Sequence, residues 1–415
     1  MEFPLMVKAR QRLASAPLED PAAALDRGLE SAGFDSAFSA GMRVAVAVGS
    51  RGIDGAAEIV ARLVSRLKEA GCCPYVVPAM GSHGGATPEG QVRVLASLGI
   101  TEGSAGAPVR SGVESIALGT TPGGAEAFID SLAMEADAIV LVNRVAPHTA
   151  FSGPVESGLA KMMAAGLGNT QGARSLHRQG FGAGHLIGEI ADRALERAPV
   201  AFGIALIEDG TKRLSRLEVL PRDRIRSDEP GLLEAAVSMY PGIPVPEADL
   251  LIVDEMGKDI SGTGMDPLVT GRGKDFAEGR RPAFSAARLV VLGLSPGSGG
   301  NATGIGHADV TTERLVRSID RWVTYRNVMT SGALFRARIP VMMPTDRDAV
   351  AAALESLGGL PRGDVKVVRI RNTARVEEFQ VSTALAEDLS GTAGVEVEVE
   401  GEAGELAFGH DGRIV

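Results

Sequence analysis

Residues 142–177 read VNRVAPHTAFSGPVESGLAKMMAAGLGNTQGARSLH, and this stretch decides the fold class. A β-branched run at 138–142 leads into it, a Gly-rich loop follows, and the stretch ends in a helix-forming segment. It contains Lys161 and two of the protein's six histidines, His148 and His177. An apolar run followed by a polar loop and a helix is typical of the strand–loop–helix units of α/β proteins.

Lys161 stands out because lysine is rare in this chain. Of the 42 basic residues only seven are lysines, so arginine is the usual cation here. Lysine, unlike arginine, can lose its proton and act as a nucleophile when it is desolvated. Its apolar neighbours, among them Leu159 and Met162, favour a lowered pKa. We therefore predict a chemical role for Lys161.

Strands and helices alternate outward from this stretch. The predicted strands cover residues 43–49, 74–78, 138–142, 200–207, 250–253, 287–294, 339–343 and 365–370. The predicted helices cover residues 56–70, 92–98, 312–322 and 346–357, with Thr87 and Pro88 as the N-cap and first residue of the second. Residues 1–40 are expected to form a helical lead-in, and the alternating run at 395–399 predicts an antiparallel edge strand.

A chain of 415 residues is too long for one core, and the proline-rich run PGIPVP at 241–246 predicts the domain boundary. We expect an N-terminal domain, residues 1–245, that carries the lysine and the histidines. A C-terminal domain, residues 246–415, is expected to contribute Gly-rich loops. The prediction is an α/β fold of two domains, each with a mostly parallel sheet flanked by helices, and an active site in the cleft between them.

Composition excludes several classes of protein. The net charge of −10 argues against a nucleic-acid binder, which normally presents a basic face. Cys72 and Cys73 are adjacent and are the only cysteines, so they predict neither a disulfide framework nor a cysteine-based zinc site. The sequence has no signal-peptide pattern and no apolar run long enough to span a bilayer. We therefore expect a soluble, cytoplasmic protein with no membrane partner.

Three chemically capable residues follow predicted strands directly: Arg51, His83 and His148. Ligands of parallel sheets bind at the carboxyl ends of the strands, so these side chains predict one site. Histidine exchanges protons near neutral pH and is also the commonest metal ligand. The pattern gives His185 and His410 a structural role and leaves the role of His307 open.

The second half of the chain offers two polar loops. Lys258 and Arg272 flank Ser261 and Thr263, a set that is able to clamp a substrate carboxylate or to form a solvated loop. The glycine-rich run at 297–306 is suited to cradle an anion through backbone N–H groups, but it lacks the Gly-Lys-Ser/Thr ending of a P-loop. A plain turn without a ligand is the other reading of this run.

The motifs of the first half resemble the nickel-pincer lactate racemase family. They are Gly81-Ser-His83, Pro147-His148, Phe151-Ser-Gly153, Lys161 and His177. The interval between the last two, 177 − 161 = 16 residues, is similar to the family's spacing from the cofactor-anchoring lysine to the nickel-binding histidine.

The resemblance implies a cofactor and a role for each matching residue. Lys161 would carry, covalently, the nickel complex of pyridinium-3,5-bisthiocarboxylic acid mononucleotide. His177 would be a nickel ligand, and Arg51 would help to hold the substrate or the cofactor. His83 and His148 would be acid/base partners on opposite faces of the substrate. The implied reaction is racemisation or epimerisation of a 2-hydroxy acid by proton-coupled hydride transfer.

The chain also departs from the family. The loop from His148 to Lys161 is a few residues longer and carries Glu156, and the family's lactate-binding motif in the second domain is not recognisable. We therefore expect a divergent homologue whose substrate is a larger or more polar 2-hydroxy acid than lactate. The resemblance also implies proteins of cofactor biosynthesis as partners, and the sequence leaves homo-oligomers open.

Three other functions remain open at this point. The histidines His83, His148 and His177 have the chemistry for a zinc-dependent hydrolase. Lys161 alone has the chemistry for a metal-free Schiff-base enzyme. A non-catalytic protein that binds a small anion or a nucleotide through its glycine loops is the third alternative.

Overall fold

The computed structural model describes residues 2–149, 151–178, 184–272, 283–389 and 397–415. The chain forms two units: a first unit, Ala14–Tyr240, and a second unit, Met1–Leu13 with Pro241–Val415. The chain passes between the units at 13/14 and at 240/241, not once at 245/246 as predicted. The N-terminal residues therefore fold with the C-terminal half of the chain.

The first unit contains a five-stranded sheet in the order β3-β2-β6-β7-β8. Its first four strands are parallel, and β8 runs antiparallel to β7 at the edge. The strands are β2 (Arg43–Val48), β3 (Cys73–Pro78), β6 (Ala138–Arg144), β7 (Val200–Glu208) and β8 (Leu214–Pro221). The predicted strands at 43–49, 74–78, 138–142 and 200–207 are confirmed.

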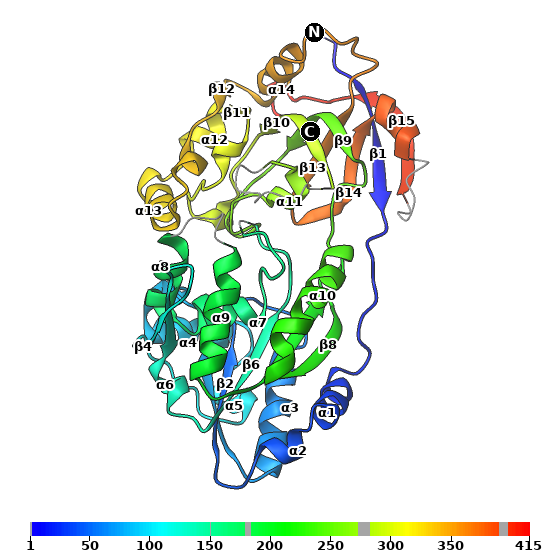
Figure 1. The fold of residues 1–415 in the computed structure, drawn as a ribbon. Coiled ribbons are helices and arrows are strands. Elements are labelled where there is room, and N and C mark those ends of the chain that lie inside the picture. Colours follow the sequence, from blue (N-terminus) through cyan, green and yellow to red (C-terminus); the bar gives the residue numbers. More distant parts are fainter. Residues whose placement is uncertain (1, 150, 179–183, 273–282, 390–396) are drawn as a thin grey trace. The chain divides into compact units, whose positions relative to one another are not determined.

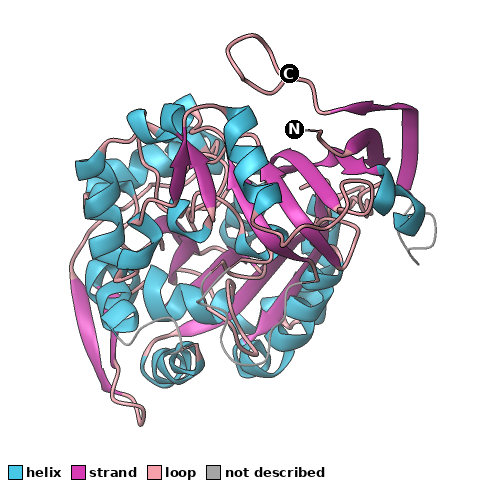
Figure 2. Ribbon diagram, turned by 90° about the horizontal axis from the view of Figure 1, so that it is seen from above, coloured by secondary structure: helices cyan, strands magenta, loops and turns pink. Residues whose placement is uncertain are grey.

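Helices cover both faces of this sheet, as Figures 1 and 2 show. Along β2, Val44 and Val46 join one core cluster, while Ala45 and Ala47 join the other. The first cluster packs against α1 (Pro21–Ser31) and α3 (Ala56–Glu69), and the second packs against α9 (His185–Arg197) and α10 (Ile225–Ser238). Burial on both sides explains why the parallel strands read as nearly continuous apolar runs.

Short elements complete the first unit. They are α2 (Phe34–Ala37), α4 (Pro88–Ser97), α5 (Glu102–Ala105), α6 (Ser131–Met134), α7 (Leu159–Lys161), α8 (Asn169–Arg178) and the hairpin β4 (Ser115–Thr120) with β5 (Glu126–Asp130). The predicted cap is confirmed, because Thr87 Oγ1 accepts a hydrogen bond from the Gly90 N–H at 3.1 Å and Pro88 begins α4. None of the helices among the described residues combines the length and apolarity that a bilayer crossing requires.

The second unit contains an eight-stranded sheet in the order β12-β11-β10-β9-β13-β14-β1-β15. The five strands from β12 to β13 are parallel, and the last three alternate in direction. They are β1 (Leu5–Gln11), β9 (Glu247–Val253), β10 (Ser285–Val291), β11 (Val310–Thr312), β12 (Val341–Met343), β13 (Val367–Asn372), β14 (Arg375–Ser382) and β15 (Val397–Glu405). Its helices include α11 (Pro267–Thr270), α14 (Asp346–Glu355) and α15 (Thr383–Leu389).

The prediction for the N-terminus is wrong in part. Residues 5–11 form β1, which pairs with β14 and β15, and Figure 1 shows this blue strand beside orange and red ones. Met6, which belongs to a core cluster of this unit, and Ala9 are buried. The partners of β1 lie more than 360 residues away, so no local pattern revealed the pairing. Helix does follow at α1 and α2.

The predicted helix at 312–322 is also wrong as a single element. Thr312 ends β11 and caps α12 (Glu313–Arg317), and Asp320 accepts hydrogen bonds that begin a separate helix, α13 (Arg321–Ser331). Two capping side chains within nine residues start two helices, because each satisfies the exposed N–H groups of a new first turn. The predicted edge strand is confirmed as β15, although residues 395 and 396 lie outside the described residues.

Candidate functional site

The carboxyl ends of three neighbouring strands form the centre of the candidate site. Within the sheet, β2 has β3 as its neighbour on one edge and β6 on the other, and the chain forms β3 first and β6 later. Ser50 follows β2, His83 follows β3 and His148 follows β6. The ends of β2 and β6 therefore make a topological switch point, where open α/β sheets bind ligands. Ser50 Oγ lies 2.5 Å from His83 Nδ1, so the first two strand ends are in direct contact.

Lys161 lies close to the strand end that carries Arg51. Burial and, to a smaller extent, the positive charge of Arg51 lower the pKa of Lys161 from 10.5 to about 7, while the charge of Glu156 opposes the shift. Desolvation in turn lowers the pKa of Arg51, although this residue is exposed overall, and the charge of Arg144 acts in the same direction. Near pH 7 a large fraction of Lys161 is therefore the neutral amine, which is the nucleophilic form.

The buried ring of Phe151 joins three predicted site residues. Lys161 Nζ lies 5.4 Å from the centre of this ring. The ring centroids of His148 and His177 lie 5.1 Å and 5.7 Å from that of Phe151. The structure therefore brings both histidines and the lysine around one aromatic side chain.

His177 is held in its neutral form. Burial lowers its pKa to about 4, and the charge of Lys161 contributes to this shift. A neutral imidazole is the form that binds a metal ion. Among the described residues, however, no group of three histidine, cysteine or carboxylate side chains is placed to hold a metal. Within the described part of the chain, His83, His148 and His177 therefore do not form the three-ligand set that the zinc-hydrolase alternative needs.

A π-helical turn, Met162–Gly166, directly follows Lys161, and the sequence did not predict it. Such turns are rare and often lie at functional sites. The turn is tied to the loop after β3, because the Gly81 N–H donates to the Gly166 carbonyl at 2.9 Å. A Cβ on Gly166 would lie 2.6 Å from the Ala79 oxygen, so glycine permits this close approach. The loop that carries His83 is thereby anchored to the segment that carries Lys161.

Glu229 is a site residue that the sequence reading missed. It lies on α10, is 1% exposed, and accepts a hydrogen bond at Oε2 from the Ala160 N–H at 2.9 Å. Oε1 has no hydrogen-bond partner among the described residues. The Asn143 side-chain amide donates to the Gly158 carbonyl at 2.6 Å. Glu229 and Asn143 therefore fix the start of α7, two residues before Lys161.

The Glu229→Gln variant is expected to remove a pH dependence of stability. Burial raises the pKa of Glu229 from 4.5 to about 7. The folded state favours the protonated carboxyl, so its contribution is full below pH 4.5 and is lost as the pH rises to about 7. Between pH 5 and pH 8, urea denaturation should show the wild type losing up to about 3 kcal/mol relative to the variant, because the other titrating groups, among them His177 and Lys161, are common to both.

The matched control is Glu234→Gln, on the exposed side of the same helix. It should keep the pH dependence of the wild type. Equal pH dependence in Glu229→Gln and the wild type would contradict a buried carboxyl that ionises with difficulty.

Glu156 organises the loop between His148 and Lys161. It is 1% exposed, and its carboxylate accepts from the His148 N–H at 2.7 Å and from the Gly153 N–H at 3.4 Å. Within the same turn the Phe151 N–H donates to His148 Nδ1 at 3.0 Å. The loop is therefore a closed turn that fixes the His148 ring.

The predicted substrate residues of the second unit divide into two groups. Lys258, Ser261 and Thr263 lie in one loop: the Lys258 ammonium donates to the Gly262 carbonyl, and the two hydroxyl oxygens lie 3.2 Å apart. Thr263 Oγ1 also donates to the Met265 carbonyl at 2.6 Å. Their role toward a substrate stays a prediction.

The arrangement of Arg272 does not support the predicted carboxylate clamp. Its Nη2 and Nη1 atoms lie 2.6 Å and 3.3 Å from the two carboxylate oxygens of Asp309, and Nη2 also donates to the Ala287 carbonyl. Asp309 in turn accepts from the Leu289 N–H on β10. The bidentate face that a substrate carboxylate would need is already used by a structural partner.

Arg272→Ala is therefore expected to lower stability without changing substrate affinity. The pair is about a quarter to a third exposed, so the expected loss is about 1 kcal/mol in the free energy of unfolding. The double variant with Asp309→Ala should lose less than the sum of the two single losses. A large rise in KM at unchanged stability would instead support the predicted role of Arg272 as a carboxylate clamp.

The glycine-rich run at 297–306 packs against the Lys258 loop. A Cβ on Gly304 would lie 1.9 Å from the Thr263 oxygen, and a Cβ on Gly264 would lie 2.1 Å from the Thr303 oxygen. His307, which the sequence left open, packs edge-on against Phe335 at 5.3 Å. Close backbone packing thus explains these glycines, and the anion cradle remains a prediction.

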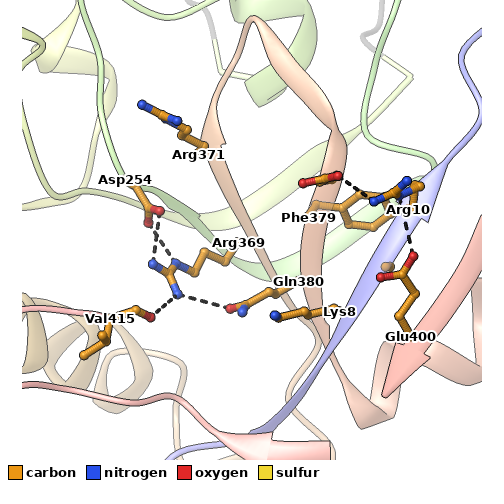
Figure 3. Close-up of a pocket in the computed structure, with 11 residues that line it drawn as sticks. Lys8, Arg10, Asp254, Arg369, Arg371, Phe379, Gln380, Glu400 and Val415 are labelled. Atoms are coloured by element: carbon orange, nitrogen blue, oxygen red, sulfur yellow. Dashed lines mark hydrogen bonds and ion pairs between the residues drawn. The ribbon is translucent and has the colours of Figure 1, made fainter. Parts of the chain in front are cut away.

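The second unit also has an open pocket of about 440 Å³ along β13, β14 and β1, and it contains none of the predicted site residues. Figure 3 shows two of its three arginines, Arg369 and Arg10, in ion pairs, and the third, Arg371, lies 3.2 Å from Glu255. Arg369 contacts Asp254 at 2.9 Å, and Arg10 contacts Glu378 at 2.7 Å. These arginines are already paired with carboxylates, so we assign no anion site to them.

The fold and the site define the first unit as a doubly wound α/β domain with a lysine of lowered pKa and histidines near its switch point. Residues 8–183 match a family model, described as the lactate racemase N-terminal domain. The resemblance to the lactate racemase family is therefore confirmed.

Two solved structures have a similar fold. One is the lactate racemase apoprotein from Thermoanaerobacterium thermosaccharolyticum, with a TM-score of 0.54 and 13% identity over 87% of this chain and 93% of that one. The other is a crystal structure of a Thermotoga maritima protein, with a TM-score of 0.51 and 16% identity over 68% of this chain and 72% of that one. No curated protein sequence matches the chain. At these identities the two structures show the two-domain fold alone, and they agree with a divergent homologue.

Proposed function

We propose that the protein is a racemase or epimerase of a 2-hydroxy acid, working by proton-coupled hydride transfer with a nickel-pincer nucleotide attached at Lys161. The observation that carries the proposal is the cluster around Phe151. There, a lysine with a pKa of about 7 and a neutral histidine lie beside the two strand ends that carry His83 and His148. The match to the lactate racemase N-terminal domain supports the same reaction class.

The residues present fit this cofactor. The neutral amine of Lys161 is able to form the covalent link, and neutral His177 supplies a nitrogen ligand that suits nickel. The positive charge of Arg51 acts on Lys161 by lowering its pKa, so the two groups are close enough to serve one ligand. The guanidinium of Arg51 is suited to hold a phosphate or a carboxylate. The bound cofactor would supply a hydride acceptor, which amino-acid side chains do not provide.

The remaining chemistry falls to the chain itself. The hydrogen on the substrate carbon is not acidic, so the hydroxyl proton must be taken up as hydride leaves, and His83 and His148 are the groups suited to the hydroxyl. Lys258, Ser261 and Thr263 are the candidate contacts for the rest of the substrate. The loop from His148 to Lys161, which carries Glu156 and is expected to be a few residues longer than in the lactate enzymes, favours a substrate larger or more polar than lactate.

The test is the intact mass and metal content of the full chain co-expressed with proteins that make the cofactor. A covalent increment that maps to Lys161, with about one nickel per chain, is the expected result. A panel of 2-hydroxy acids then identifies the substrate, and turnover of lactate alone would contradict the larger-substrate proposal. An unmodified Lys161 that borohydride traps with a keto acid would overturn the nickel proposal in favour of Schiff-base chemistry.

A further inference from the structure

The imidazole rings of His83 and His148, which follow the ends of β3 and β6, have different kinds of hydrogen-bond partner. His83 Nδ1 lies 2.5 Å from the Ser50 hydroxyl. His148 Nδ1 accepts a hydrogen bond from the Phe151 backbone N–H at 3.0 Å. A hydroxyl can donate or accept, whereas a backbone amide can only donate. The two rings are therefore not chemically equivalent.

The amide donor selects one state of the His148 ring. A neutral ring that accepts at Nδ1 carries its proton at Nε2, so it offers an N–H there and no lone pair. The imidazolium form would place an Nδ1–H against the Phe151 N–H. The Glu156 carboxylate fixes the same turn by accepting from the His148 N–H at 2.7 Å. A ring flip would break the Phe151 bond, which contributes about 0.5–1.5 kcal/mol, and a proton on Nδ1 would set two donors against each other.

The hydroxyl partner leaves His83 able to change its protonation state. Ser50 Oγ accepts from Nδ1–H when the ring is neutral with a lone pair at Nε2, and it accepts equally when the ring is protonated. A proton can therefore enter and leave at Nε2 without breaking the Ser50 contact. This is the behaviour required of a general base that later acts as the acid.

We propose that His83 exchanges the proton of the substrate hydroxyl in both half-reactions, and that His148 is a neutral hydrogen-bond donor to the same oxygen. Ser50 and Glu156 are positioning residues for these two rings. The inference rests on the proposed function and changes the roles that the two histidines are expected to have in it. His83 acts as both base and acid, and His148 polarises the carbonyl. The family resemblance, in contrast, implied that both histidines act as acid/base partners.

The proton transfers balance with a single base. In the first step the hydroxyl O–H bond breaks and an N–H bond forms at His83 Nε2. The O–H electron pair becomes the second C–O bond as hydrogen leaves the carbon with two electrons for the hydride acceptor. In the second step the hydride returns to the carbonyl carbon and the His83 proton returns to oxygen. Inversion then requires the planar keto acid to turn over between the two steps.

The direct test is nitrogen NMR of the full chain, labelled with ¹⁵N-histidine and free of cofactor, at about pH 8, where an ordinary histidine is neutral. The His148 signals, assigned by their loss in His148→Gln, are expected to show the Nε2–H tautomer. A proton on Nδ1 of His148 would overturn the inference. This result does not depend on turnover, so it stands or falls separately from the proposed function.

The second test compares variants of the cofactor-loaded enzyme. His148→Gln keeps an N–H donor and is expected to lower kcat by about tenfold, because a donor is replaced and not removed. His83→Gln removes the base and is expected to lower kcat by about 10²–10⁴-fold. Equal losses in the two variants would overturn the inference. Absence of turnover of any 2-hydroxy acid by the loaded wild type would overturn only the proposed function.

A positioning role for Ser50 predicts rescue by a hydroxyl. Ser50→Ala is expected to lower kcat several-fold with little change in KM, and Ser50→Thr is expected to recover most of the loss. Thermal unfolding of both variants shows whether either change is merely structural. Equal kcat values for Ser50→Ala and the wild type would remove Ser50 from the proposal.

Discussion

Lys161→Arg is expected to leave the chain without covalent cofactor and to abolish turnover. Arginine keeps the positive charge but does not deprotonate in proteins, so the neutral amine that burial creates at this position is lost. We expect no mass increment and a loss of at least about 10⁶-fold in kcat, the lower range of enzymatic rate enhancement. Intact mass, nickel content and turnover of the co-expressed variant measure the effect.

The matched control is Lys8→Arg, an exposed position on β1. It should carry the same covalent increment and nickel content as the wild type. A loaded and active Lys161→Arg enzyme would eliminate the tethered-cofactor proposal, since no nucleophilic amine would remain at that position.

Lys161→Met separates the chemical role of the lysine from its cost to the fold. The folded pKa of about 7 lies below the ordinary value of 10.5, so the unfolded chain binds more protons between these two pH values. Wild-type stability should therefore rise as the pH increases from 7 toward 10.5. The methionine variant should lack this rise and be at least as stable as the wild type at neutral pH.

Gly158→Ala is expected to destabilise the first unit by about 3 kcal/mol. Its backbone is extended, with φ of 172°, so an alanine there is not strained by its own dihedral angles. The added Cβ would instead lie 1.8 Å from Glu229 Oε1. Relief of that contact must move the carboxylate from Ala160 or shift the start of α7, which carries Lys161. Urea denaturation measures the loss, and covalent loading of Lys161 should fall with it.

Two further variants make this expectation specific. Gly231→Ala, on the same helix as Glu229, has open space around the added Cβ and should leave stability unchanged or raise it by about 0.5–1 kcal/mol. Glu229→Ala in the Gly158→Ala background removes the colliding atoms, so the double variant should lose less than the two single losses combined. Additive losses would place the cause outside this contact.

Local pattern was enough to predict most strands and the helices that flank them. The run Arg43–Val48 is strand because alternate β-branched and small side chains fill the two faces of a covered sheet. The same reasoning failed where the partner is distant, as for β1, and where two caps lie close together, as at Thr312 and Asp320. The sequence of a strand does not reveal which distant strand it pairs with, because its hydrophobic pattern reports only which side chains are buried.

The candidate site shows a similar division. Its reactive side chains lie in recognisable motifs, and strand-end logic predicted that they would meet. Their supporting residues carry no such signal: Glu229 is an acidic residue beside a proline within a helix, and Ser50 is one serine among many. Arg272 matched the chemistry of a clamp but is paired with Asp309.

The sequence by itself determined the α/β class and the motif residues, and the rarity of lysine in the chain drew attention to Lys161. Periodicity and residue chemistry are local properties, so they can be read from the sequence. Only the tertiary structure decided that β1 completes the second unit's sheet, that Glu229 anchors the lysine-bearing segment, and that His83 and His148 have unlike partners. Burial and hydrogen-bond partners depend on segments far apart in the chain. They set the pKa of Lys161 and the tautomer of His148, which the order of the residues does not specify.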